Sequence, residues 1–243
     1  MAEHFQARGV RVFVPELDPT RGIEFRGGQL RDQVTAALGN GALDPHSKTH
    51  IIAHSMGGLD SRYMLSPANA HAFAPPVRSL TTISTPHRGS PIADAIDARL
   101  EIIPFPHLPF GPPESPVEAV LNVLGISLDS LRDLTTARCQ AFSDHYSDHP
   151  AVAYFSVAGA GRAAFPQTAA ALMLFRQYIH AATGQANDGL VSLQSAAWGA
   201  VDPHPWQADH VEEVGYDLDR LPFPPAFGYL AKFDAIADKV AAL

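Results

Sequence analysis

The sequence has little cysteine and few basic residues, and each shortage excludes a class of protein. A single cysteine, Cys139, occurs in 243 residues, so the chain can form neither an intrachain disulfide nor a thiolate metal cluster. Lysine and arginine number 17 against 25 aspartate and glutamate residues, which gives a net charge of −8. This balance argues against nucleic acid or an anionic membrane surface as a partner. We expect Cys139 to be an inert core residue.

Long apolar runs are also missing. No stretch is apolar over the roughly 20 residues that a bilayer-spanning helix needs, so we expect no stable membrane insertion. The first residues, Met1 to His4, lack the basic start of a secretory signal. These features predict either a cytoplasmic protein that begins at Met1 or a chain whose upstream segment, with a possible secretion signal, is missing.

The chain does contain an alternation of strand-like and helix-like segments. With 46% hydrophobic residues it is long enough for one well-buried domain, residues 1–243. Apolar runs predict strands at 10–14, 51–53, 77–83 and 152–157. Helical periodicity predicts helices at 27–38 and 59–65. Strands separated by helices predict an α/β fold, in which helices cover both faces of a mostly parallel sheet.

One proline-rich segment interrupts this alternation. Six prolines lie between residues 104 and 116, where they disfavour a central strand. Residues 115–118, Ser-Pro-Val-Glu, form a capping box that predicts a short helix closed by Gly125. The apolar face of this helix predicts either ordinary packing or a lid over an apolar pocket. We assign residues 101–130 to a lid-like insertion within the domain.

The stretch Ala53-His54-Ser55-Met56-Gly57 follows one predicted strand and precedes a predicted helix. This is the setting of a nucleophile elbow, a sharp turn that exposes a serine hydroxyl. The residues two before and two after the serine must be small, and alanine and glycine meet that need. The five-residue pattern arises often by chance, but the flanking strand and helix strengthen it. Ser55 is therefore the candidate nucleophile.

A serine nucleophile needs an imidazole to take its proton and an acid to orient that imidazole. In a hydrolase sheet the acid and then the histidine follow the serine along the chain. Of the 12 histidines, only His204 and His210 come late enough. We expect His204, between two prolines, to be exposed, and prefer His210 as the base. Asp188, in an Asn-Asp-Gly turn, is the candidate acid, although turn chemistry alone could explain it.

These motifs together resemble those of the lidded bacterial triacylglycerol lipases of the α/β-hydrolase fold and of related intracellular lipase-like hydrolases. The likeness covers nearly the whole chain in order, through residues 13–16, 53–58, 85–90, 134–137, 187–191 and 209–213. In that family the aspartate of the Asn-Asp-Gly-Leu-Val motif is the triad acid, and the histidine of the last motif is the base. The resemblance thus gives these roles to Asp188 and His210.

Other polar residues near these motifs have simpler explanations. His54 and His87 match positions that the family uses around its site, and we expect packing or hydrogen-bonding roles for both rather than the role of base. Asp60, one turn after the elbow, and Asp94 are expected at helix surfaces or caps.

The resemblance is incomplete at a calcium site. Secreted members of the family hold a structural calcium ion with carboxylates from two separate segments. Glu212 occupies one of these places, but residues 161–168 contain no acidic residue. A hard dication with one protein carboxylate binds weakly. We therefore expect no tight calcium site, no other metal and no cofactor.

The oxyanion site also departs from the family. One donor is the backbone N–H of the residue after the nucleophile, here Met56, and a second comes from a loop after an early strand. The sequence starts inside the helix that follows this loop, so the N-terminal strand and the oxyanion loop have no counterpart in it. Losing one donor costs about 10²–10³ in rate, whereas losing the serine or the base costs roughly 10⁶. We expect an impaired enzyme rather than an inactive one.

The sequence thus predicts a serine carboxylic-ester hydrolase, a lipase or esterase, that cleaves lipid or acyl esters through an acyl-enzyme. The lid-like helix favours medium or long acyl chains and predicts a transient contact with a lipid interface. One alternative is a short-chain esterase or a phospholipase, which the same triad would serve. Another is a catalytically impaired lipid-binding protein with a hydrolase fold.

Overall fold

The computed structural model describes residues 1–69, 76–98, 127–161, 170–215 and 227–243. The predicted lid-like helix and most of the 101–130 insertion lie outside these residues. The described elements, in chain order, are α1 (Ala2–Ala7), α2 (Ile23–Gly39), β1 (Thr49–His54), α3 (Met56–Leu65), β2 (Val77–Ile83), α4 (Pro91–Asp97), α6 (Leu128–Arg132), α7 (Thr136–His145), β3 (Ala153–Val157), α8 (Ala170–Thr183), α9 (Leu193–Ala196), β4 (Ala200–Val201), the 3₁₀ turn η1 (Glu212–Val214) and α10 (Tyr229–Ala241).

The strands form a parallel sheet in the order β1-β2-β3-β4. Ile83, the last residue of β2, lies beside His54 of β1 and Val157 of β3. Three strands therefore end at the same level, and the residues that follow them meet at one edge of the sheet. In parallel α/β sheets this carboxyl edge is where ligands bind.

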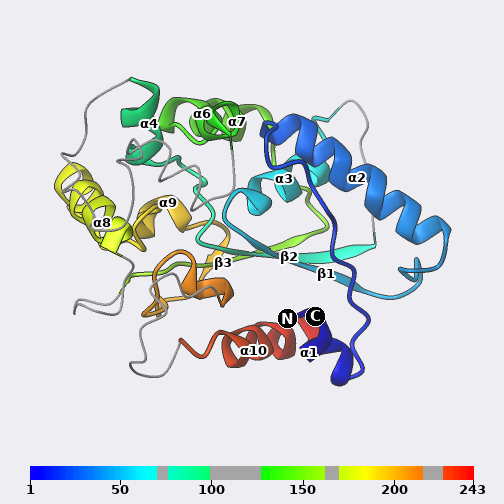
Figure 1. Cartoon of the computed structure of the whole chain (residues 1–243). Helices are drawn as coiled ribbons and strands as arrows, with labels where there is room; N and C mark the ends of the chain where they lie inside the picture. The colour runs from blue at the N-terminus through cyan, green and yellow to red at the C-terminus, as the bar shows by residue number, and fades with distance from the viewer. Residues whose placement is uncertain (70–75, 99–126, 162–169, 216–226) are drawn as a thin grey trace.

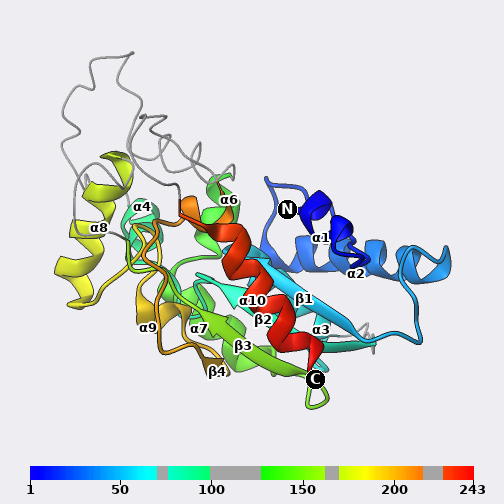
Figure 2. The ribbon, with the colours of Figure 1, turned by 90° about the horizontal axis from the view of Figure 1, so that it is seen from below.

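Helices cover both faces of the sheet, as the strand-helix alternation predicted (Figure 1). Helices α2 and α3 lie on one face, and α1 and α10 lie on the other. Figure 2 shows α10 crossing the strands from below. Helix α10 packs Phe233, Ile236 and Val240 against Ile83 and Val157 of the sheet. On the opposite face Leu30 and Val34 of α2 pack with Met64, Leu65 and Leu80.

Three predicted strands are confirmed and one prediction is wrong. The strand predicted at 77–83 has those bounds, and the other two differ by one or two residues. Residues 10–14 form no strand. This segment packs only through Val12 and Phe13, whereas Val10 and Val14 are exposed. An apolar run forms a strand only where its backbone can hydrogen-bond to the edge of a sheet. Among the described residues, no strand pairs with this run.

Helix α2 begins four residues before its predicted start, at Ile23. The cause is a contact distant in sequence, because the N–H of Ile23 donates to Asp133 Oδ2 over 2.9 Å. A carboxylate at this position satisfies one of the free N–H groups of the first helical turn. Within the described part of the chain, no helix combines the length and the apolar character needed to cross a bilayer.

Candidate active site

Ser55 lies in the sharp turn between β1 and α3, with φ 54° and ψ −133°. This positive φ is unusual for any residue other than glycine. The turn is held from both sides, because the N–H of Ser55 donates to the carbonyl of Ile83 over 2.9 Å, and Thr85 Oγ1 donates to the carbonyl of Ser55 over 2.7 Å. A Cβ at Gly58 would overlap the side chain of Thr85. Glycine at position 58 therefore lets α3 approach the strand ends, whereas a Cβ at Gly57, the glycine of the elbow pattern, would make only an ordinary contact with Ala53.

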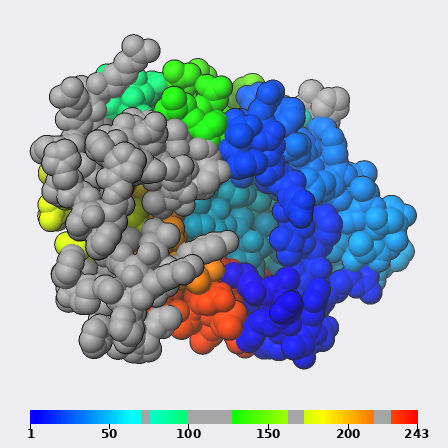
Figure 3. Space-filling view, in the orientation of Figure 1, coloured from blue at the N-terminus to red at the C-terminus, as the bar shows by residue number. Residues whose placement is uncertain are grey.

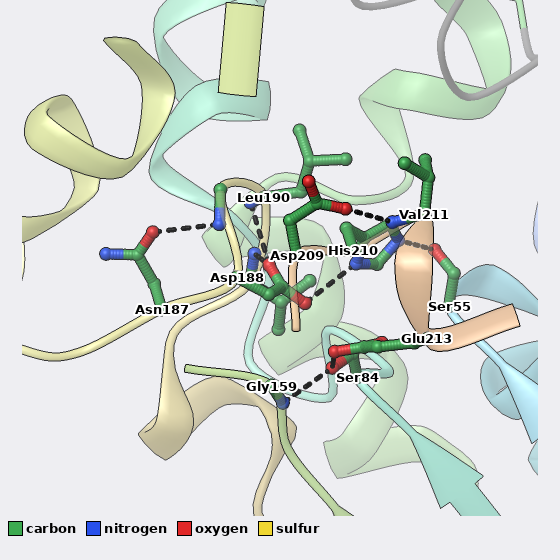
Figure 4. A network of polar contacts seen from close by, with 12 residues as sticks. Ser55, Ser84, Gly159, Asn187, Asp188, Leu190, Asp209, His210, Val211 and Glu213 are labelled. Atoms are coloured by element: carbon green, nitrogen blue, oxygen red, sulfur yellow. Dashed lines mark hydrogen bonds and ion pairs between the residues drawn. The ribbon is translucent and has the colours of Figure 1, made fainter. Parts of the chain in front are cut away.

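The structure brings the three predicted triad residues together (Figure 4). His210 Nε2 lies 2.9 Å from Ser55 Oγ, and His210 Nδ1 lies 2.8 Å from Asp188 Oδ2. The side chains of His210 and Asp188 are 1% and 0% exposed. A third hydrogen bond holds His210 beside Asp188, since the N–H of His210 donates to the carbonyl of Asp188 over 3.0 Å. This geometry gives a continuous hydrogen-bonded path from a hydroxyl through an imidazole to a carboxylate.

The Asn-Asp-Gly turn presents the carboxylate of Asp188. Its Oδ1 accepts hydrogen bonds from the N–H groups of Leu190 and Val191, at 2.8 and 2.7 Å, which leaves Oδ2 for His210. Burial alone would raise the pKa of Asp188, but the His210 imidazole and the two backbone donors hold the pKa below its ordinary value. One oxygen of Asp188 thus makes the hydrogen bonds of the turn, and the other oxygen points at the histidine.

A second acid and imidazole pair lies beside this path. Glu213 is fully buried; its Oε1 accepts from Ser84 Oγ over 2.7 Å, and its Oε2 lies 3.2 Å from His54 Nε2. Ser84 Oγ in turn accepts from the N–H of Gly159 over 3.0 Å. Burial, followed by the charge of Asp188, raises the pKa of Glu213 well above its ordinary range.

Sequence reasoning included Glu213 in a family motif but gave it no role, and it missed Ser84. The signal that was available for Glu213 is its place, three positions after the candidate base, as the second of two acidic residues that stand between two valines. The prediction that His54 makes a hydrogen bond is confirmed by its contact with Glu213. Burial lowers the pKa of His54 to about 3, so its ring is neutral. The rings of His54 and His210 are 4.5 Å apart between centroids.

His87 is buried under the site and packs as predicted. Its Nε2 lies 3.0 Å from Thr82 Oγ1, and its ring stacks on Trp198 with the centroids 5.1 Å apart. The guanidinium of Arg62 lies 3.6 Å from the centre of the Trp198 ring and 3.3 Å from His87 Nδ1. These contacts make a rigid support under the strand ends.

The structure also tests four residues that were given roles outside the triad. His204 is exposed, with 90% of its side chain in solvent, as predicted. Cys139 is buried as predicted, and burial raises its pKa to about 12. Asp94 is a cap as predicted, because its Oδ1 accepts from the N–H of Thr136 at the start of α7 over 2.7 Å.

The prediction for Asp60 is wrong. Its side chain is 0% exposed and forms an ion pair with Arg26 of α2, with Oδ2 2.8 Å from the nearer guanidinium nitrogen. Burial raises the pKa of Asp60 to about 6. The position one turn after the elbow faces α2 rather than solvent, a helix packing that the local sequence did not indicate.

An apolar pocket opens in front of Ser55 and His210. The other residues that line it are Pro86, Ser90, Ile92, Ala93, Leu131, Leu134, Leu190 and Val191. They come from α4, from α6 and the turn that follows it, and from the loops that follow β2 and α8. A hydroxyl and an imidazole thus lie at the wall of a pocket suited to a hydrocarbon group.

Figure 3 shows the molecule in space-filling form from the side seen in Figure 1. Residues coloured as β1 and α3 form the floor of a hollow between the N-terminal segment and the C-terminal part of the chain.

Among the described residues, one group of side chains has the types and the spacing of metal ligands. His54, His210 and Glu213 each offer one donor atom, and these atoms lie within 4.8 Å of one another. Glu212, at the family's calcium position, accepts the N–H of Asp209 over 3.0 Å. Most of residues 161–168 lies outside the described part of the chain, so the expectation about calcium stays a prediction.

Solved structures resemble this chain in fold, and curated relatives resemble it in sequence. No family model matches it. The mature form of a Bacillus licheniformis lipase has a similar fold, with a TM-score of 0.65 and 22% identity over 92% of this chain and 76% of that one. This likeness supports the α/β-hydrolase fold.

Two triacylglycerol lipases are related in sequence. The lipase of Pseudarthrobacter phenanthrenivorans is 30% identical over 86% of this chain and 79% of its own length. Triacylglycerol lipase 2 of Saccharomyces cerevisiae is 29% identical over 87% of this chain, which spans only 60% of that protein. The chain belongs to the triacylglycerol lipase family, whose members are carboxylic ester hydrolases.

Proposed function

We propose that this chain hydrolyses lipid or acyl esters through a serine acyl-enzyme, with Ser55, His210 and Asp188 as its triad. The observation that carries the proposal is the hydrogen-bonded path from Ser55 Oγ to Asp188, which faces an apolar pocket. A half-buried serine followed by a buried histidine and a buried aspartate at these distances has the geometry of an activated nucleophile.

The reaction begins when Ser55 Oγ attacks the carbonyl carbon of the ester. His210 Nε2 takes the hydroxyl proton, and the ionised Asp188 holds the Nδ1–H tautomer and stabilises the imidazolium. The tetrahedral intermediate collapses as His210 gives the proton to the leaving alcohol, which leaves the acyl group on Ser55. A water molecule, deprotonated by His210, then attacks this ester and releases the acid.

Met56 supplies one donor for the tetrahedral oxyanion. It is the first residue of α3, and the N–H groups of the first helical turn are not used within the helix. The positive end of the helix dipole adds to this stabilisation. One such donor contributes about 10²–10³ in rate.

The pocket supports an acyl substrate with an apolar chain. Its side chains are mainly aliphatic, and each methylene that leaves water for such a site contributes about 0.8 kcal/mol. We therefore favour esters of medium or long acyl chains over small soluble esters. Residues 101–130 remain our proposal for a lid-like insertion that touches a lipid interface.

The test is hydrolysis of p-nitrophenyl esters by the parent chain and by Ser55→Ala. We expect a burst of nitrophenolate in the parent and a loss of roughly 10⁶ in kcat in the variant. Ser47→Ala, which changes an exposed serine before the start of β1, at the opposite end of that strand from the elbow, is the matched control and should keep the parent rate. Equal rates for the parent and Ser55→Ala would reject the proposal.

A series of esters from acetate to palmitate then defines the substrate. A higher kcat/KM for octanoate than for acetate supports a lipase, and the reverse order would identify a short-chain esterase. A phospholipase would instead prefer a phosphoglyceride to a triacylglycerol of the same chains. Binding of a fatty acid probe without turnover would favour the lipid-binding alternative.

A further inference from the structure

We infer that His54, His210 and Glu213 form an inhibitory binding site for zinc or a similar divalent transition metal ion. The binding part of this inference rests on the arrangement of three side chains, and its inhibitory part rests on the proposed function. The three residues come from the end of β1 and from the segment that enters η1, and they meet beside the candidate nucleophile.

The donor set suits zinc better than a hard cation. Two imidazoles and one carboxylate are the protein ligands of several catalytic zinc sites. Calcium and magnesium instead require six or more oxygen ligands, which these three residues cannot provide. Among divalent ions we therefore expect binding by zinc, nickel and copper and none by calcium or magnesium.

Two of the three donors already have the spacing of ligands on one ion. Ligands that each bind tetrahedral zinc at about 2.0–2.1 Å lie roughly 3.3 Å apart. His54 Nε2 and Glu213 Oε2 are separated by 3.2 Å. An ion can replace the hydrogen bond between them with little movement of either residue, and Ser84 continues to hold the other oxygen of Glu213.

His210 completes the site only by moving. The three donor atoms lie as far as 4.8 Å apart, which exceeds the tetrahedral spacing, so the imidazole must shift toward His54. Both of its nitrogens are engaged, one by Ser55 and the other by Asp188. Whichever nitrogen binds the ion is lost to the triad, so the bound state cannot activate Ser55.

The ion has a route to these ligands. His54 keeps 21% of its side-chain surface exposed, although His210 and Glu213 are buried. His210 also lines the apolar pocket. An ion can therefore meet His54 or His210 first and then reach Glu213.

The first measurement is inhibition of ester hydrolysis by zinc chloride, reversed by a chelator. We expect zinc to inhibit and equal concentrations of calcium or magnesium chloride to have no effect. In Glu213→Gln and in His54→Gln, the zinc concentration for half-inhibition, measured against each variant's own rate, should rise at least about tenfold. Glutamine retains the shape of Glu213 but is a poor zinc ligand.

The matched control is His204→Ala, since His204 is an exposed histidine remote from the triad. We expect it to keep the parent's half-inhibition value. An unchanged value in both Glu213→Gln and His54→Gln, or a changed one in His204→Ala, would overturn the site by assigning the inhibition to surface histidines.

Calorimetry separates the site from the proposed function. Ser55→Ala keeps all three ligands, so it should bind one zinc ion per chain even though it is inactive. A cobalt chloride titration of the unsubstituted chain should give the intense visible bands of a tetrahedral ion, and this readout does not depend on whether the variants fold. One-to-one binding in an inactive parent would refute only the proposed function. Absent cobalt bands together with no calorimetric binding would refute the site.

Discussion

The structure holds two acid and imidazole pairs side by side, Asp188 with His210 and Glu213 with His54, and their environments shift the pKa values of the two carboxyl groups in opposite directions. The contact distances are 2.8 and 3.2 Å. Asp188 also accepts two backbone N–H groups, and its pKa lies below the ordinary value. Glu213 has a hydroxyl donor, Ser84, in place of two backbone donors, and its burial, followed by the charge of Asp188, raises its pKa well above the ordinary value.

Residue type alone therefore does not decide which of the two pairs can relay a proton. The lowered pKa of Asp188 favours the ionised form, which stabilises an imidazolium, whereas the raised pKa of Glu213 disfavours that form. Only the first pair reaches Ser55 Oγ. The second pair instead ties η1 to the ends of β1 and β2 through His54 and Ser84.

Replacing either histidine by alanine, one at a time, should give the largest difference in activity between the two pairs. His210→Ala should lower kcat for a p-nitrophenyl ester by roughly 10⁶, because the hydroxyl of Ser55 loses its proton acceptor. His54→Ala should lower it by less than about tenfold, equivalent to about 1.4 kcal/mol in the barrier. Steady-state kinetics of both variants checks this, and equal losses would show that the pairs do not differ in role.

Replacing either acid by its amide should give the next largest difference in activity. Asp188→Asn should lower kcat by about 10⁴, because a carboxamide favours the wrong tautomer of His210. Glu213→Gln replaces a neutral acid by a neutral amide of the same shape, so we expect a loss of at most about tenfold. A pH-rate profile of each variant accompanies the rates. A loss for Glu213→Gln as large as for Asp188→Asn would mean that Glu213 is ionised in the active state.

Crowding the second pair should lower stability. A Cβ at Gly159 would overlap Glu213 Oε1, and overpacking of a rigid interior costs about 1–3 kcal/mol. Gly159→Ala should therefore shift the urea unfolding midpoint downward. Gly28→Ala, at a helical position with open space around it, is the control and should not lower the midpoint. Equal midpoints for Gly159→Ala and the parent would indicate that the carboxyl of Glu213 moves freely.

The opposite pKa shifts of Asp188 and Glu213 also predict opposite pH dependences of stability. Above the ordinary carboxyl pKa of 4.5, native Glu213 keeps a proton that the unfolded chain has lost. Its contribution to the free energy of unfolding therefore falls as pH rises from about 4.5 toward its raised pKa. The contribution of Asp188 is present above its ordinary pKa of 3.8 and is lost as pH falls through its lowered pKa.

Urea unfolding of the parent and of Glu213→Gln at pH 5, 6, 7 and 8 measures the Glu213 effect. The stability of the parent relative to the variant should decrease along this series. A constant difference would show that Glu213 does not change its protonation state on unfolding.

Local pattern predicted much of the fold and the candidate triad, but it failed where contacts are distant in sequence. The run at 77–83 is rich in β-branched residues, with valine and isoleucine at its ends and two threonines within it, so its strand could be predicted directly. The early start of α2 depends on Asp133, 110 positions away. The partnership of His54 with Glu213 spans 159 positions. Neither contact leaves a periodic signal.

The same limit explains the two errors. An apolar run at 10–14 has the composition of a strand, but pairing depends on a free sheet edge in the right place. Aspartate is a residue type usually found at the surface, but the approach of α2 buries Asp60 with Arg26. Asp188 was found because its turn and its family motif are both local in sequence.

The backbone of Ser55 has one more consequence. Its positive φ of 54° is costly for a residue with a side chain, by about 1–3 kcal/mol, and glycine relieves that cost. Replacing the nucleophile by glycine should therefore yield an inert protein that withstands heat better than the alanine variant at the same position. The proposed role of Ser55 as nucleophile thus comes with a cost in stability at the same position.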